Sequence, residues 1–167
     1  PVGTPGTVWF TGGTEFEYFN DPERTAETRS ADGAASTVGD VGYVDDDGYL
    51  YLTDRASYMI ISGGVNIYPA EVESVLITHP SVGDVAVFGV PNDEWGEEVK
   101  AVVEPRAGVA PSAELAQSLL EFCSGKMARY KLPRSIDFLE QLPRDPSGKL
   151  YKRKLRDAYW RDRERAI

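Results

Sequence analysis

One segment of the chain combines residue types and spacing that could act on an anionic substrate. Residues 143–149 read Pro-Arg-Asp-Pro-Ser-Gly-Lys. The prolines and the glycine predict a loop, since proline fixes φ and lacks an N–H while glycine reaches positive φ. Lys149 follows Gly148, so an ammonium group stands where a ligand could approach the backbone closely. The alternative is a solvated surface lysine, which is what most lysines are.

This segment differs from the phosphate-binding P-loop. That motif places Ser or Thr directly after its lysine and another glycine five residues before the glycine that precedes the lysine. Here Leu150 follows Lys149, and Pro143 stands at the position of the first glycine. Lys149 alone does not decide between a ligand-binding role and a purely solvent-exposed one.

Regular elements on both sides must position this loop. An apolar run at residues 136–139 predicts a strand that leads into it, and the basic stretch after it predicts a helix. Lys149 would then lie at a loop-to-helix junction. The apolar face of that helix would be formed by Tyr151, Leu155, Ala158 and Tyr159.

Composition limits the class of protein. The 167 residues are 41% hydrophobic and 11% aromatic, which allows a packed core and argues against disorder. The net charge of −9 disfavours nucleic acid as the partner of the whole chain. From Lys126 onward, however, 13 basic residues accompany six acidic ones. That balance suits a small anion such as a nucleotide, and it suits a solvated helix face equally well.

Cysteine usage and hydropathy bear on location. Cys123 can form no disulfide within the chain, which indicates a reducing, cytoplasmic compartment. No signal-like segment opens the chain, and no run of about 18 apolar residues could span a membrane. Because Pro1 stands in what reads as a strand-and-turn region, we expect a piece of a longer protein.

Most of the acidic and metal-binding residue types have a structural explanation. Residues 45–48, Asp-Asp-Asp-Gly, lie between apolar runs and predict a hairpin turn, and they lack the ligand spacing of a calcium loop. Asp40 differs because it follows Gly39 within a predicted strand. The lone histidine, His79, precedes Pro80 and marks a helix end. We therefore predict no metal site.

Four segments together resemble the adenylate-forming enzymes, which include acyl-CoA synthetases, peptide-synthetase adenylation domains and firefly-type luciferases. Residues 54–73, Asp-Arg-Ala-Ser-Tyr-Met-Ile-Ile-Ser-Gly-Gly-Val-Asn-Ile-Tyr-Pro-Ala-Glu-Val-Glu, are similar to the hinge-and-loop motif of that family. Residues 37–40, Thr-Val-Gly-Asp, resemble its Thr-Gly-Asp motif with Val38 inserted, and residues 17–25 resemble the segment before it. Residues 142–149 are similar to its C-terminal lysine motif.

The resemblance spans nearly the whole chain and implies a fold of the α/β (α+β) class. Residues 1–54 would be the β-rich end of a large N-terminal domain. Residues 55–167 would be a small C-terminal lid domain with a short sheet of about three main strands and packed helices, with a hinge near residues 55–58. The main strands would be residues 82–90, 98–104 and 134–139.

The resemblance also implies two half-reactions of an acid–thiol ligase. A carboxylate, with a fatty acid favoured, attacks the α-phosphate of ATP to give an acyl-adenylate and pyrophosphate. The thiol of coenzyme A then attacks that anhydride. Mg²⁺ would accompany ATP and be bound mainly by the large N-terminal domain, which would also hold the acyl pocket. The small domain would rotate between the steps. Because the phosphate loop and the substrate pockets would belong to the large N-terminal domain, the isolated chain should be inactive.

The site residues implied by the resemblance have suitable chemistry. The Lys149 ammonium would stabilise charge on the oxygens that bridge acid and phosphate. Asp40, an acceptor-only carboxylate, would bind the ribose hydroxyls of ATP, and Arg55 would lie near its ribose and phosphates. A glycine turn would border the path of coenzyme A, because absent side chains permit close approach of a thin pantetheine arm. That turn consists of Ser62, Gly63 and Gly64.

Three residues depart from the family pattern. Ser57 stands at the hinge position where the family usually has aspartate or lysine, and Tyr58 replaces a frequent aspartate beside it. Serine can absorb the torsion change of a hinge, but it supplies no electrostatic latch. Val65 stands where many members have glutamate, and with the following Asn-Ile-Tyr-Pro it resembles bacterial fatty-acid-CoA ligases.

Other interpretations stay open. An adenylation module that loads a carrier protein would share these motifs, and so would a luciferase-like oxygenase. A non-catalytic docking domain would have no need of Lys149 or Asp40.

Overall fold

The computed structural model describes residues 1–161 and divides the chain into two compact units, Pro1–Ser57 and Tyr58–Ile167. The last six residues of the predicted lid domain, 162–167, lie outside the described residues. No helix within residues 1–161 combines the length and apolar character needed to cross a bilayer.

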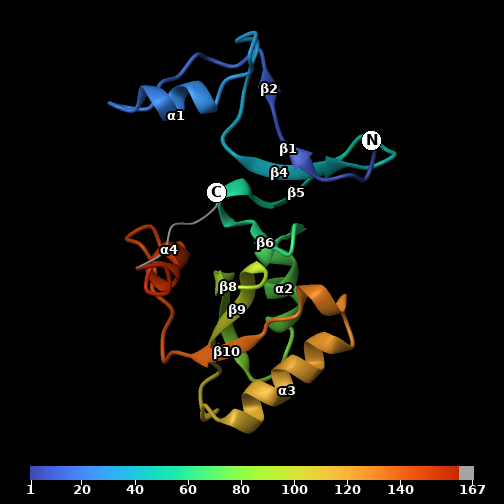
Figure 1. Cartoon of the computed structure of the whole chain (residues 1–167), viewed down its shortest axis with the longest axis vertical. Helices are drawn as coiled ribbons and strands as arrows, with labels where there is room; N and C mark the ends of the chain where they lie inside the picture. Colours follow the sequence, from blue (N-terminus) through green and yellow to red (C-terminus); the bar gives the residue numbers. More distant parts are fainter. Residues whose placement is uncertain (162–167) are drawn as a thin grey trace. The chain divides into compact units, whose positions relative to one another are not determined.

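The first unit consists of short antiparallel strands and one helix (Figure 1). Its elements are β1 (Gly6–Thr7), β2 (Phe10–Thr11), α1 (Pro22–Glu27), β3 (Ala35–Ser36), β4 (Asp40–Val44) and β5 (Leu50–Arg55). β4 pairs with both β1 and β5, and β2 pairs with β3. A short 3₁₀ turn, Ala56–Tyr58, follows β5.

The predicted turn at residues 45–48 joins β4 to β5. Asp45 Oδ1 accepts hydrogen bonds from the backbone N–H groups of Asp47, at 3.0 Å, and Tyr49, at 2.8 Å. Gly48 has φ of +84°, a conformation that glycine adopts without steric cost. The acidic cluster therefore shapes a hairpin, as its sequence predicts.

The second unit is a mixed sheet with packed helices, which confirms the α+β class. Its elements are β6 (Ile60–Ser62), β7 (Val65–Ile67), α2 (Pro69–Leu76), β8 (Val82–Asn92), β9 (Gly96–Pro105), α3 (Ala113–Ser124), β10 (Ser135–Phe138) and α4 (Lys152–Arg156). A 3₁₀ turn, Arg129–Lys131, precedes β10. The three main strands predicted from the sequence correspond to β8, β9 and β10, and the β6–β7 hairpin extends the sheet to five strands.

The centre of this sheet is the long antiparallel pair of β8 and β9, which runs from Val82 opposite Pro105 to Asn92 opposite Gly96 with a shift of register between Val82 and Asp84. β10 adds to β9 in parallel, with Ser135 opposite Lys100. A parallel neighbour needs a crossover connection, and α3 with the 3₁₀ turn supplies it. β6 reaches β9 at a single pair, Ser62 with Gly96.

Both faces of the β8–β9 pair are buried, which explains their near-continuous apolar runs. One face packs against α2 and α3; its buried residues include Val85, Val87, Val99, Ala101 and Val103. The opposite face packs against the segment around Lys149 and α4; the buried residues of this second core are Ala86, Phe88, Val90 and Val102 of the strands and Leu142 of that segment. Figure 1 shows α2 and α3 on one side of β8 and β9 and α4 on the other.

The helix after Lys149 differs from its sequence-based prediction. α4 spans only five residues, with Tyr151 as its N-terminal cap residue, and Tyr151 is exposed rather than part of an apolar face. Leu155 packs against the sheet as predicted, but the buried residue of the first turn is Lys152. A charged side chain is buried here because it has an ion-pair partner beneath the helix.

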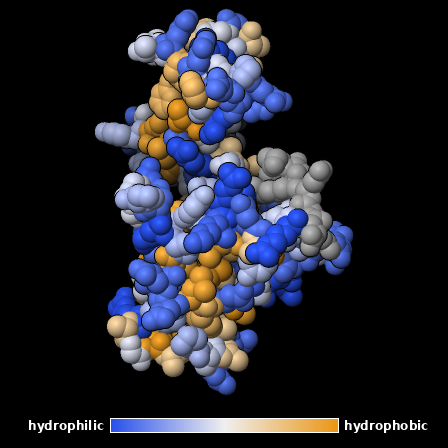
Figure 2. All heavy atoms as spheres, turned by 90° about the vertical axis from the view of Figure 1, so that its left-hand side faces the viewer, coloured by the Kyte–Doolittle hydropathy of each residue, from blue (hydrophilic) through white to orange (hydrophobic). Residues whose placement is uncertain are grey.

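Large apolar side chains remain exposed in both units, and Figure 2 shows orange areas in its upper and its lower part. In the first unit Phe19 is 91% exposed, and Leu50 and Leu52 of β5 are also exposed. Surface of this kind is typical of a segment that packs against further protein.

Tyr159, near the end of the described residues, makes a polar contact with the sheet. Tyr159 donates a hydrogen bond from its hydroxyl to Asp137 Oδ2 at 2.6 Å, and Lys100 Nζ lies 2.9 Å from the same oxygen. Burial opposes ionisation of Asp137, but the hydrogen bond from Tyr159 and the charge of Lys100 lower its pKa below the usual value. Partial burial, the hydrogen bond and the charge of Asp137 raise the pKa of Tyr159 to about 12.

Tyr159→Phe should lower the stability of the second unit by about 1 kcal/mol or less, since one partly exposed hydrogen bond is lost. It should also change the pH dependence. A raised folded-state pKa contributes stability that is present below the unfolded value near 10 and is lost as pH rises toward about 12. Urea unfolding at pH 9 and pH 11.5 would measure both effects. If the free energy of unfolding fell by the same amount between pH 9 and pH 11.5 in the wild type and in the variant, the raised pKa of Tyr159 would be contradicted.

Candidate functional site

The loop around Lys149 is a closed turn with a fixed backbone. Arg144 and Leu150 form an antiparallel bridge, and the N–H of Tyr151 donates to the Pro143 carbonyl at 2.8 Å. Gly148 has φ of +85°, a backbone conformation that favours glycine because glycine has no Cβ. The loop predicted from the prolines and the glycine is therefore present, and the Lys149 residue at its end is exposed.

Asp145 organises the interior of this turn. Its Oδ1 accepts hydrogen bonds from Ser147 Oγ at 2.6 Å, from Ser147 N–H at 2.8 Å and from Lys149 N–H at 3.0 Å. The hydrogen bond from the Ser147 hydroxyl is the largest influence on the pKa of Asp145 and lowers it. Desolvation opposes this effect, and the backbone N–H groups of Lys149 and Ser147 and the Lys149 charge add to it, so the pKa lies below the usual value. The carboxylate therefore stays ionised and keeps its acceptor role at neutral pH.

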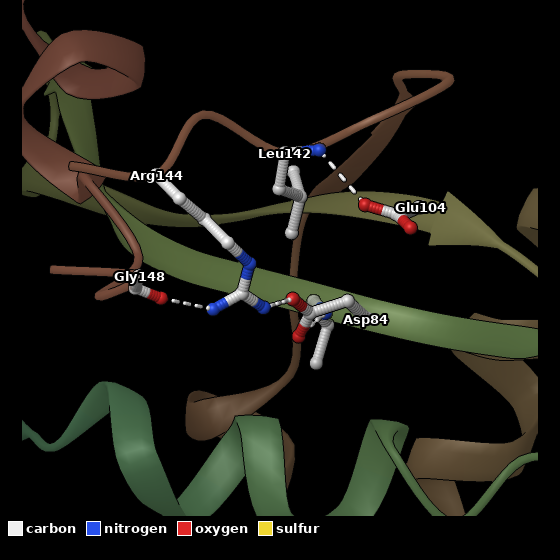
Figure 3. Close-up of polar contacts among 6 residues, drawn as sticks. Asp84, Glu104, Leu142, Arg144 and Gly148 are labelled. Carbon is white, nitrogen blue, oxygen red and sulfur yellow. Dashed lines mark hydrogen bonds and ion pairs between the residues drawn. The ribbon is translucent and has the colours of Figure 1, made fainter. Parts of the chain in front are cut away.

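Two side chains attach the start of this turn to the sheet (Figure 3). Glu104 of β9 accepts a hydrogen bond from Leu142 N–H at 2.8 Å. The Arg144 guanidinium donates to the Gly148 carbonyl at 2.8 Å and, through its other terminal nitrogen, to Asp84 of β8. The turn is thus bound to both central strands.

A buried ion pair attaches the other end. Lys152 Nζ lies 2.7 Å from Glu73 Oε1, and the side chains are only 10% and 19% exposed. The same Glu73 oxygen accepts a hydrogen bond from Val87 N–H in β8 at 2.6 Å. Glu73 belongs to α2, so the ion pair links α4 to α2 beside β8.

The first unit brings Asp40 and Arg55 together. They pair across β4 and β5, and Arg55 Nε lies 3.2 Å from Asp40 Oδ1. Asp40 is about one-fifth exposed and Arg55 about half exposed, so the pair borders solvent. A carboxylate has more acceptor positions than this single contact uses, which leaves capacity for hydroxyl donors.

The predicted glycine turn joins β6 to β7 in the second unit. Gly63 and Gly64 have φ of +57° and +77°. Gly63 also lies against the Trp95 indole, where a Cβ would come within 2.5 Å of ring carbon Cε3, and its N–H donates to the Trp95 carbonyl at 2.8 Å. The turn therefore requires glycine at Gly63 for two independent reasons.

The two loops of the second unit contact different ends of the β8–β9 hairpin. Asp84, which holds the Lys149 turn, lies near the start of β8, while Trp95 lies in the turn after β8. Asp84 and Asn92 are eight strand residues apart, which corresponds to roughly 27 Å at 3.4 Å per residue. The structure thus gives the lysine loop and the glycine turn separate anchor points.

The residues around the unit boundary include the predicted hinge residue Ser57. The first unit ends at Ser57 and the second begins at Tyr58. Lys152 Nζ lies 5.2 Å from the centre of the Tyr58 ring, so the buried cation of α4 also contacts this residue. The hinge function of Ser57 stays a prediction.

Other residue types that could do chemistry have structural roles. His79 lies just after α2, accepts a hydrogen bond from Ser81 N–H and contacts the Phe122 ring edge-on. Cys123 is buried in the core between α3 and the sheet, and burial raises the pKa of its thiol. Within residues 1–161 no three His, Cys, Asp or Glu side chains gather as metal ligands would.

Sequence patterns carry no direct signal for the roles of three residues that hold the candidate site. Arg144 belongs to the loop motif, but its partner Asp84 is 60 residues away. Lys152 reads as one of several solvated basic residues, although it is buried. Trp95 reads as part of a polar loop, although it packs on Gly63. Contacts between distant segments are invisible to periodicity and local spacing.

Comparison with known proteins identifies relatives for both units. A family model described as "AMP-binding enzyme C-terminal domain" matches residues 71–149, which include Asp84, Arg144 and Lys149. The chain is 47% identical over 144 residues to a long-chain-fatty-acid–CoA ligase, FadD13, of Mycobacterium tuberculosis, with 86% of this chain and 27% of the relative aligned. It is 42% identical over its whole length to a fatty acid–[acyl-carrier-protein] ligase, ScoC, of Streptomyces coeruleorubidus, and covers 31% of it.

Solved structures agree with these matches. The crystal structure of ATP-bound MatB from Rhodopseudomonas palustris aligns with 97% of this chain at a TM-score of 0.81 and 32% identity. The chain covers 31% of that protein. It therefore spans about a third or less of the length of the relatives it matches.

The contact between Gly63 and Trp95 leads to a test of the glycine turn. Gly64→Ala should cost about 1–2 kcal/mol, the steric penalty of the left-handed conformation, because nothing else lies near its Cβ position. Gly63→Ala should cost more, because the indole must also move. Urea unfolding monitored by fluorescence would measure both.

A double variant provides the control for this prediction. Adding Trp95→Leu to Gly63→Ala should remove the extra cost, so the two substitutions should be strongly non-additive. Simple additivity, or equal costs at Gly63 and Gly64, would contradict the role of the indole.

Proposed function

Because the chain belongs to the adenylate-forming enzymes, whose AMP-binding C-terminal domain it contains, we propose that it is the C-terminal part of an ATP-dependent acyl-CoA synthetase. In the first half-reaction a carboxylate oxygen attacks the α-phosphorus of ATP, and the bond to the leaving pyrophosphate breaks. In the second, the sulfur of coenzyme A attacks the acyl carbonyl carbon and AMP leaves. The observation that carries the proposal is an exposed Lys149 on a backbone held by hydrogen bonds.

The proposed role of Lys149 is electrostatic. The first half-reaction brings two anions together, so the transition state needs a positive charge near the bridging oxygens. A compact ammonium on a flexible stem can reach those oxygens while its backbone stays fixed. A preorganised charge of this kind stabilises the transition state without reorganisation during the reaction.

Asp40 and Arg55 are proposed to contact the nucleotide. The Asp40 carboxylate would accept the two ribose hydroxyls of ATP, and Arg55 would lie near the ribose and phosphates. Their ion pair across β4 and β5 supports this role, since it orients the carboxylate before ATP binds.

The glycine turn is proposed to border the path of coenzyme A in the second half-reaction. Ser62, Gly63 and Gly64 leave the backbone accessible to a narrow thiol arm. The separation of this turn from the Lys149 loop along β8 supports a mechanism in which the small domain presents different surfaces in the two steps, with Ser57 as the hinge.

The proposed acid is a fatty acid and the proposed acceptor is coenzyme A. The similarity to a long-chain-fatty-acid–CoA ligase supports both, together with Val65 and the Asn-Ile-Tyr-Pro sequence after it. ScoC acts with an acyl-carrier protein, so loading of a carrier protein is the second candidate function. Thioester formation with free coenzyme A and with a phosphopantetheinylated carrier protein would separate the two.

The binding of Mg²⁺ and of the acyl group is proposed to depend mainly on a domain outside this chain. Mg²⁺ would arrive with ATP and be held mainly by the preceding domain, where the acyl pocket would also lie. The exposed apolar residues of β5 support the presence of such a partner domain. Residues 1–167 alone would then be inactive, and the buried thiol of Cys123 fits the reducing cytoplasm.

Lys149→Ala in the full-length protein should reduce carboxylate-dependent ATP–pyrophosphate exchange by about 10²–10³-fold. Thioester formation from a supplied acyl-adenylate and coenzyme A should persist, because that step needs no new bond to phosphorus. Lys126→Ala, which removes another exposed lysine of the second unit, should leave both rates unchanged.

Three results would contradict this proposal. Exchange that survives Lys149→Ala would make Lys149 a surface lysine without a catalytic role. Loss of both half-reactions together would remove its assignment to the first step. Absence of exchange in the wild type with every acid tried would favour a docking domain over an enzyme.

Asp40→Asn should raise the KM for ATP about tenfold or more, since a charged acceptor of hydrogen bonds is lost. The same change of charge at an exposed carboxylate of the first unit, Glu15→Gln, is the control. ATP titrations of the exchange rate would measure both. An unchanged KM in Asp40→Asn would remove this residue from the proposed ribose site.

A further inference from the structure

We propose that Arg144 and Asp84 are positioning residues for Lys149, and that they act by fixing the peptide group that precedes it. The inference rests on the proposed role of Lys149 in the first half-reaction. It assigns a function to an ion pair between β8 and the loop, two segments that are 60 residues apart in the sequence.

The key geometry concerns a single peptide unit. The carbonyl of Gly148 and the N–H of Lys149 belong to the same planar group. Arg144 donates to that carbonyl at 2.8 Å, and Asp145 accepts from that N–H at 3.0 Å. Because both polar ends of the plane are bound, its orientation is set, and with it the direction in which the Lys149 side chain leaves the backbone.

Arg144 also connects this peptide to the rigid part of the unit. One terminal nitrogen of its guanidinium binds the Gly148 carbonyl, and the other binds Asp84 Oδ2 (Figure 3). Asp84 lies in β8, where its other oxygen accepts from Val85 N–H at 2.8 Å. The planar fork of arginine suits such a two-sided contact, and a lysine ammonium does not reproduce it.

The residues on both sides of the loop limit how the peptide between Gly148 and Lys149 can be oriented. Leu142, just before the loop, is buried and bonded to Glu104, and Lys152, just after it, is buried against Glu73. Gly148 needs its positive φ and has no side chain that could hold the turn. Asp145 and backbone hydrogen bonds hold the turn from within, and the Arg144 side chain connects its tip to β8.

A direct role in binding ATP is the competing explanation, because Arg144 is about half exposed and positively charged. The two roles make opposite predictions for its partner. If Arg144 contacts ATP, then Asp84→Asn frees the guanidinium and leaves the first half-reaction intact. If Arg144 positions Lys149, then Asp84→Asn weakens the contact that holds the guanidinium in place and slows that half-reaction.

The test uses the full-length protein with the variants Arg144→Ala, Arg144→Lys and Asp84→Asn. Lys131→Ala is the matched control, because it breaks a partly exposed ion pair of the same unit, with Glu71, away from the loop. The measurements are ATP–pyrophosphate exchange, thioester formation from supplied acyl-adenylate, and amide hydrogen exchange across residues 144–151.

The expected results follow from misplacement of Lys149 by about 1 Å, which can cost on the order of 10²-fold in rate. Arg144→Ala and Asp84→Asn should lower the maximal exchange rate about 10–100-fold with little change in the KM for ATP. The maximal exchange rate of Arg144→Lys should lie between that of these two variants and that of the wild type. Thioester formation should stay at the wild-type rate, and amide exchange should accelerate in residues 144–151 alone, while Lys131→Ala changes none of these.

Several results would overturn the inference without touching the proposed function. An unchanged exchange rate in Arg144→Ala, when Lys149→Ala abolishes exchange, would show that Lys149 needs no such support. A wild-type rate in Asp84→Asn with a raised KM for ATP in Arg144→Ala would make Arg144 a ligand of ATP. Equal loss of both half-reactions, or accelerated amide exchange throughout the second unit, would reduce the pair to a stabilising contact.

Discussion

The pairing of β8 with β9 is the constraint on which the second unit depends. The two strands alternate their side chains between two cores, so that Val87 faces α2 and α3 while Phe88 faces the lysine loop and α4. α4 has only five residues, far fewer than an isolated helix needs in water. It exists because the second core receives Leu155 and because Glu73 neutralises Lys152. The segment that carries Lys149 is thus folded by the sheet, and not by its own helical propensity.

This arrangement holds the backbone of the turn in place but leaves the Lys149 side chain exposed to solvent. Within the turn around Lys149, the short Asp145 side chain accepts hydrogen bonds from the backbone N–H groups of Ser147 and Lys149, and Gly148 supplies the positive φ. The long side chain of Arg144 then spans the distance to β8. The lysine side chain itself stays exposed, so its conformational freedom is retained while its starting point is defined. A charge that must meet a transition state benefits from both properties, because positioning is settled in advance and only a few torsions remain to be ordered.

The sequence allowed prediction of those features that are local. The apolar runs indicated β8, β9 and β10, Asp-Gly indicated the hairpin turn, and the glycines indicated the turn after β6. The candidate residues came from family resemblance, since no spacing rule links Asp40 to Lys149. What escaped prediction depends on tertiary packing. Tyr151 was assigned to an apolar face because periodicity treats tyrosine as apolar and lysine as polar, whereas the buried residue is Lys152 with Glu73 as its partner. Pattern reasoning places charges outside, and it has no means of locating a partner 79 residues earlier.

Lys152 also clarifies the departure at Tyr58 from the family pattern. An aspartate at that position would lie near a lysine whose charge Glu73 already neutralises at 2.7 Å, and a second carboxylate would add repulsion between like charges. A neutral aromatic ring accepts the same cation through its face, 5.2 Å away, without competing for its hydrogen bonds. Tyr58 thereby keeps α4 in contact with the start of the second unit. Ser57 itself carries no charge, and its role as a hinge stays a prediction.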